Sequence, residues 1–241
     1  MGGRQVVSAR RLLADALDVT ASEADLARAA HDVVIRLGSA GRLPELVGDL
    51  AAGGGDPVGC ARLSYRHVLG FDKLLLIDGG PHHMLRAHVW HPGAHSPEDI
   101  HNHRSPLASY IVRGALRMEL YAAARDGGEE AARYRESLSH DTADWLLEPA
   151  GPARLRLTQV AEYTAGSSYA LPAHTLHRAW STAADPTVTL FLETGAQRRR
   201  HTDVFLGADA ERHSPAVPKT PLDVKEYLRE LDALARLLSE A

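Results

Sequence analysis

The sequence lacks several features that would place it in a class at once. Its 241 residues include one cysteine, Cys60, so no intramolecular disulfide can form and secretion is not indicated. No segment approaches the roughly 20 consecutive apolar residues that a membrane span needs. The first residues also lack the apolar centre of a signal peptide. We therefore expect a cytoplasmic protein with no membrane partner.

The chain also lacks an excess of basic residues. Its formal net charge of −4 does not indicate nucleic-acid binding, and the run of three arginines at 198–200 is too short to change this. Hydrophobic residues make up 44% and charged residues 24%, which predicts a sizeable core. We expect a monomer or homodimer whose partners are small molecules.

Residues 1–58 are predicted to be helices that pack on the rest of the chain. Ser22 and Asp25 have the spacing of a capping box at the start of a helix. A run with helical period follows, so this helix should bury one face. Its apolar positions are Leu26, Ala29, Ala30, Val33, Val34 and Leu37.

Residues 59–205 carry short strand-like runs separated by Gly, Pro, Asp or Asn, which favours a β-sandwich or small barrel over alternating βαβ units. Residues 206–241 are predicted to be a connector and a helix, with Thr220 as its cap and Pro221 in its first turn. That helix should pack on the barrel or on a second subunit, and the three segments should form a single domain. Its apolar stripe is Leu228, Leu231, Leu234, Leu237 and Leu238.

The segment from Asp99 to Gly114 carries the first sign of a metal site. His101 and His103 are separated by one residue at the start of a strand-like run, so their side chains can share one face. Two neutral imidazoles that converge suit a borderline divalent metal. Solvated loop histidines would give the same pattern, so a metal site needs a third ligand.

A third candidate lies in the segment from Gly166 to Ser181. Gly166, Pro172 and His177 fall on the spacing of the second conserved motif of the cupin superfamily, and the first segment resembles the first motif. The resemblance implies an all-β cupin, a double-stranded β-helix or jelly-roll barrel. It also implies a metal held by His101, His103 and His177.

The glutamate of the first cupin motif is missing, because Leu107 and Ala108 occupy its place. A site with three histidines and no carboxylate leaves positions open for substrate and for dioxygen or water. His174 occupies the place of a motif glycine. It is an alternative to His177 as the third ligand, although a role at the rim, in substrate binding, fits its position better.

Within the cupins, about residues 60–205 resemble cysteine dioxygenase and related thiol dioxygenases. These proteins also begin with helices, and their third histidine precedes an arginine, as His177 precedes Arg178. The resemblance implies Fe(II) as the cofactor, with Ni, Mn, Cu and Zn as alternatives. It also places Arg66 near the arginine that pairs with the substrate carboxylate in that family.

The family's Ser-x-His-x-Tyr pattern falls here on Thr189, Phe191 and Glu193, so free cysteine is not expected to be the substrate. By the period of two, these three side chains share a strand face. We assign Phe191 to substrate binding. Glu193 is assigned as a catalytic group that can receive a substrate ammonium, and Tyr110 is the other candidate proton carrier. The alternative for Glu193 is a solvated residue at a strand end.

A second histidine-rich group resembles a metal site by number alone. Several of its members flank turns, and the motif spacing selects other residues, so we do not expect this group to hold the metal. Its members are His82, His83, His88, His91 and His95.

We therefore expect a cupin oxygenase that uses Fe(II) and dioxygen on a small amino-acid-like or carboxylate-bearing metabolite. Three neutral ligands leave the charge of the metal uncompensated, which favours an anionic or chelating substrate. One alternative is a non-redox metal-dependent lyase or isomerase, with Glu193 or Tyr110 as proton carrier. Another is a cupin that binds a small molecule without catalysis.

Overall fold

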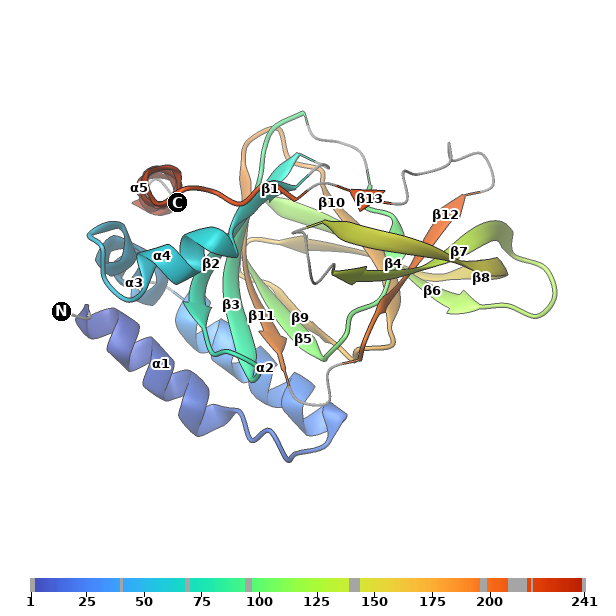
Figure 1. The fold of residues 1–241 in the computed structure, drawn as a ribbon, viewed down its shortest axis with the longest axis horizontal. Coiled ribbons are helices and arrows are strands. Elements are labelled where there is room, and N and C mark those ends of the chain that lie inside the picture. Colours follow the sequence, from blue (N-terminus) through green and yellow to red (C-terminus); the bar gives the residue numbers. More distant parts are fainter. Residues whose placement is uncertain are drawn as a thin grey trace.

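The computed structural model describes residues 3–39, 41–67, 70–93, 97–138, 144–195, 199–207, 216–217 and 219–239. Five helices in this part of the chain lie together on one side of the strands (Figure 1). None of them has the length and apolar character needed to cross a membrane. They are α1 (Arg4–Ala16), α2 (Glu23–Gly38), α3 (Arg42–Ala51), α4 (Pro57–Arg62) and α5 (Val224–Ser239).

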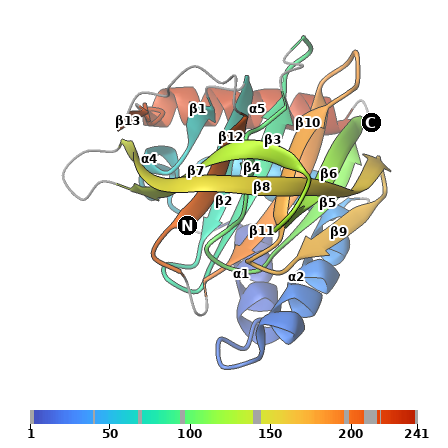
Figure 2. The same cartoon turned by 90° about the vertical axis from the view of Figure 1, so that its right-hand side faces the viewer.

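The strands form two antiparallel sheets, and Figure 2 shows the long β8 running across in front of the first sheet. In spatial order the first sheet contains β1 (Tyr65–His67), β2 (Phe71–Asp78), β3 (His83–Trp90), β11 (Thr187–Thr194), β5 (Leu107–Arg113) and β9 (Ser168–Leu171). The second contains β13 (Ala216–Val217), β8 (Trp145–Thr164), β6 (Ala115–Ala123), β10 (Leu176–Ser181), β4 (Ile100–His101), β12 (Thr202–Gly207) and β7 (Glu129–Leu138).

The strand order identifies the fold. The central strands of the first sheet run β3-β11-β5-β9, and those of the second run β4-β10-β6-β8. Sequence neighbours thus alternate between two facing sheets, as in the two Greek keys of a jelly roll. The predicted all-β, cupin-type barrel with helices at both ends is confirmed.

The centre of the first sheet is covered on both faces, and every side chain of β11 is buried. On β11, Val188, Leu190 and Leu192 face the helices, while Phe191 lies in the apolar cluster inside the barrel. The helix face predicted for α2 is buried against this sheet, and Ser22 accepts the bond from the backbone nitrogen of Asp25 as expected. The helices therefore support one wall of the barrel from outside.

The C-terminal helix begins later than predicted. Asp223 accepts from the backbone nitrogen of Glu226, and the Glu226 carboxylate accepts from the backbone nitrogen of Asp223. This reciprocal capping box fixes the start of α5 at Val224, whereas Pro221 forms an isolated bridge with Tyr65. The prediction that Thr220 caps the helix was therefore wrong.

The leucine stripe of α5 packs on α3, α4 and β2 of the same chain. Leu231 has no exposed surface, and the Tyr227 hydroxyl donates to the carbonyl of Leu75 at 2.6 Å. We expect Leu231→Ala to lower the free energy of unfolding by about 3 kcal/mol, because it leaves a cavity in a packed core. Chemical denaturation measures this, with the exposed Arg229→Ala as control. Equal effects of the two changes would show that α5 does not stabilise the barrel.

Candidate metal centre

The three predicted ligands meet inside the barrel, on the second sheet. His101 on β4 and His177 on β10 are direct partners in the antiparallel ladder. His103 follows after one residue, and its backbone nitrogen donates to the carbonyl of Ala173 at 3.0 Å. The ring centroids are 4.6 Å apart for His101 and His177, and 5.1 Å apart for each pair that includes His103. One candidate ligand atom from each residue lies within 4.8 Å of the other two.

Backbone carbonyls orient two of the rings. The Nδ1 of His101 lies 2.8 Å from the carbonyl oxygen of Asp99, and the Nδ1 of His177 lies 3.0 Å from that of Thr175. A carbonyl can only accept, so each Nδ1 carries the proton and each Nε2 presents a lone pair. Such bonds fix the tautomer of histidine ligands in metal sites.

Burial keeps the three rings neutral. It lowers the pKa of His101 and that of His177 to about 4, and it lowers the pKa of His103 well below the usual value. Imidazoles bind metals in their neutral form, so this cluster is ready to act as a ligand set at neutral pH.

The inner face of the first sheet lies opposite this cluster. Phe191 lies between the two sides, with its ring centroid 5.8 Å from that of His103 and 4.7 Å from that of His88 on β3. Phe191 thus lies beside the three-histidine cluster, a position that its predicted role in substrate binding requires.

Glu193 also points into the barrel, two residues after Phe191. It is 7% exposed, and its Oε2 accepts from Nη1 of Arg86 at 3.1 Å. The Ser105 hydroxyl donates to its other oxygen at 3.4 Å. Glu193 is therefore not a solvated strand-end residue, and its charge is balanced by Arg86.

The structure does not bring three of the predicted site residues to the cluster. Tyr110 lies on the outer face of β5, where its ring meets the backbone of Gly38 on α2 so closely that a side chain there would collide with it. Arg66 is exposed and pairs with Glu230 on α5 at 3.1 Å. His174 is exposed and lies 3.7 Å from Glu23.

Arg66 does line a pocket, although a different one. This opening of about 380 Å³ is lined by residues of β1, β2 and α5 and by none of the three clustered histidines. It also holds an ion pair between Asp72 and His91, whose atoms lie 2.7 Å apart. The other lining residues are His67, Gly70, Phe71 and Glu230.

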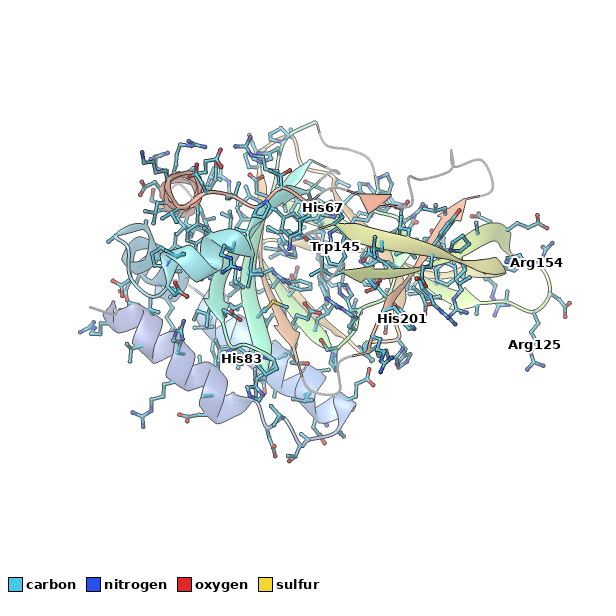
Figure 3. All side chains as sticks on the ribbon, viewed as in Figure 1. His67, His83, Arg125, Trp145, Arg154 and His201 are labelled. Carbon is cyan, nitrogen blue, oxygen red and sulfur yellow. The ribbon has the colours of Figure 1, made fainter. Side chains whose placement is uncertain are left out.

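The second histidine group does not form a metal site in the described part of the chain, where the three-histidine cluster is the group found. His91 is exposed beside Asp72, and Figure 3 shows His83 at the lower end of β3, away from His67. His95 lies outside the described residues. His88, in contrast, points into the barrel, and sequence reasoning missed it. The period of two on β3 was the available signal, since it groups His88 with Arg86 and Trp90.

Glu98 was also missed. It is partly buried just before β4, and burial raises the pKa of its carboxyl group. Its charge acts in turn on the pKa of His177. A carboxyl group near the metal ligands that tends to keep its proton is a candidate acid or base.

The buried histidines predict a loss of stability in mild acid. In the unfolded chain they titrate near the usual pKa of 6.5, whereas in the folded protein their pKa values are lowered, to about 4 for His101 and His177. Between these values the unfolded state binds more protons, so stability falls as the pH drops. His91 acts in the opposite sense, because Asp72 raises its pKa. The residues with a lowered pKa are His67, His83, His88, His101, His103 and His177.

We therefore expect the melting temperature of the metal-free protein to decrease between pH 6.5 and pH 4.5, as thermal unfolding followed by circular dichroism would measure. A constant melting temperature over that range would contradict the neutral state of these rings.

The chain matches no protein-family model and no curated protein. Solved structures resemble it in part. KdgF from Halomonas sp. shares 18% identity over 56% of this chain and 88% of its own, with a TM-score of 0.33. An RmlC-like cupin from Shewanella frigidimarina shares 16% identity over 56% of this chain and 84% of its own, with a TM-score of 0.35. The polyketide cyclase RemF from Streptomyces resistomycificus shares 14% identity over 61% of this chain and 82% of its own, with a TM-score of 0.37. Likeness at this level does not extend to activity.

Proposed function

We propose that this chain is an Fe(II)-dependent oxygenase that uses dioxygen to oxidise a small carboxylate-bearing metabolite. The observation that supports it is the convergence of His101, His103 and His177 inside a barrel, with ligand atoms within 4.8 Å of one another. Three neutral imidazoles suit Fe(II) as well as Ni, Mn, Cu and Zn. Bound Fe(II) would supply dioxygen activation next to the substrate.

The residues of the chain determine which substrate can enter. None of the three ligands is a carboxylate, so the metal keeps its double positive charge and attracts an anionic or chelating group. Phe191 covers one side of the cluster and excludes water there. The Arg86–Glu193 pair borders the same space on the inner face of the first sheet.

This geometry changes the role proposed for Glu193. Because Arg86 binds one carboxylate oxygen and Ser105 the other, Glu193 is better placed to hold the Arg86 guanidinium than to receive a substrate ammonium. We therefore assign Glu193 as a positioning residue. The proposed substrate still carries a carboxylate, but it no longer needs a cationic group. Free cysteine remains an unexpected substrate.

Oxygen uptake tests the proposal. Protein purified without oxygen, stripped of metal and reloaded with Fe(II) should consume dioxygen with at least one member of a panel of amino, keto and dicarboxylic acids. The same protein loaded with Zn(II) should not, since Zn(II) has no redox chemistry. Turnover of a substrate without oxygen uptake would overturn the oxygenase assignment, and so would efficient oxygen uptake with cysteine alone.

A non-redox lyase or isomerase is the second candidate, and Glu98 is the observation that favours it. A partly buried carboxyl group whose pKa is raised by burial, and whose charge acts on His177, is a candidate for acid or base catalysis. Activity in the Zn(II)-loaded protein that is lost in Glu98→Gln would support this candidate.

A further inference from the structure

We propose that the inner face of β3, at Arg86 and His88, is a second substrate subsite that binds a carboxylate, so that the substrate is a short dicarboxylate with its other end at the metal. This inference rests on the proposed function, because it concerns the same barrel interior. It assigns a role to two residues that do not belong to the metal cluster.

The first observation is a row of buried nitrogen atoms with no partner. The Nε of Arg86, the Nε2 of His88 and the Nε1 of Trp90 are buried and make no hydrogen bond to any described residue. His88 is 8% exposed and Trp90 is 3% exposed. The three residues alternate along β3, so their side chains share the face that points into the barrel.

Buried nitrogen atoms without a hydrogen-bond partner destabilise the folded protein. A buried polar group without a partner costs on the order of 1–3 kcal/mol, and most native polar groups therefore have one. His88 lies next to the three-histidine cluster, since the Phe191 ring stacks on His88 on one side and lies tilted against His103 on the other. A carboxylate that reaches from the metal past Phe191 can satisfy the nitrogen of His88, with Arg86 and Trp90 two residues away on either side along β3.

The charges around this row select the ligand group. Arg86 is balanced by Glu193, but Lys73 on β2 is the direct cross-strand partner of His88 and places its ammonium 5.2 Å from the Phe71 ring centroid. The positive charge of Lys73 also contributes to lowering the pKa of His88, after burial. The wall therefore offers hydrogen-bond donors and the positive charge of Lys73, which also acts on the carboxyl groups of Glu98 and Glu136. Donors beside a cation suit a carboxylate.

The spacing then sets the size of the ligand. The metal ligands and His88 are separated by one aromatic ring, Phe191, and both ends of this interval are positive when a metal is bound. A linear chain with a carboxylate at each end fits this arrangement better than a monocarboxylate, which would leave the nitrogen atoms of β3 unpaired.

Binding of simple acids to the Zn(II)-loaded protein tests the subsite without turnover. Isothermal titration should show that one member of the series succinate, glutarate and adipate binds at least tenfold more tightly than the monocarboxylate of equal length. In His88→Phe, which keeps the stacked ring and removes the nitrogen atoms, this preference should disappear. His88→Gln should retain part of it, because the amide can still donate.

Thermal unfolding without ligand is the second readout. If the His88 nitrogen has no hydrogen-bond partner until a ligand binds, His88→Phe removes an unpaired polar group and should raise the melting temperature. A lower melting temperature, or an unchanged dicarboxylate preference in His88→Phe, would overturn the subsite. Failure to bind Zn(II) at all, or a lack of oxygen uptake with Fe(II), would count instead against the proposed function, so the two failures are distinguishable.

Discussion

Replacing His177 with alanine should leave the barrel folded and remove most of its bound metal. Two imidazoles would remain, and loss of a direct ligand should cost more than the roughly 10–100-fold in affinity that loss of an outer hydrogen-bond partner costs. Elemental analysis of purified protein measures the metal, and circular dichroism with sedimentation checks the fold.

The matched control is His174→Ala, three residues earlier in the chain. His174 is exposed and lies against Glu23 outside the cluster, so this variant should keep its full metal content. A His174→Ala protein that loses metal, beside a His177→Ala protein that keeps it, would show that the third ligand is misassigned.

The three-histidine cluster could be predicted because the spacing of its members is tied to the fold. His101 lies on β4 and His103 follows it after one residue, and the jelly roll makes β10, which carries His177, the ladder partner of β4. The strand period also placed Phe191 and Glu193 together on the inner face. These predictions needed only the spacing of the motifs and the alternation of a strand.

Other site residues could not be predicted in the same way, because the first sheet is buried on both faces. Buried apolar side chains occur on both sides of β2, β3, β5 and β11, so hydrophobicity alone does not show which alternate set faces the barrel interior. Tyr110 lies one position after Ser109, and that single step moves it to the helix side. Arg66 is away from the cluster for another reason: it lies on the edge strand β1, opposite Asp72, and its side chain is exposed.

The Arg86–Glu193 pair could not be foreseen from the sequence, because it joins side chains separated by 107 positions. The two residues lie on adjacent strands in the centre of the first sheet, where the register partner of Arg86 is Phe191, two residues before Glu193. Their side chains are 16% and 9% exposed, so the charges are largely removed from water. Each charge therefore depends on the other for its stability in the interior.

Glu193→Gln should lower the free energy of unfolding by roughly 3 kcal/mol, because it leaves the Arg86 charge in the barrel without its partner. The double change Glu193→Gln with Arg86→Met should recover much of that loss, since it removes both charges. Chemical denaturation of the wild type, the single variants and the double variant measures the coupling between the two positions. Metal content should stay the same in all of them.

An exposed ion pair on α1 supplies the matched control for this cycle. Arg11 and Asp15 lie 3.6 Å apart with side chains 84% and 71% exposed, so Asp15→Asn should cost less than about 1 kcal/mol. If Glu193→Gln costs no more than this, the interior pair does not hold its charges away from water, and Glu193 would again be available to bind a substrate ammonium. A large cost with recovery in the double variant would instead establish Glu193 as the residue that keeps Arg86 in place on the inner face of β3.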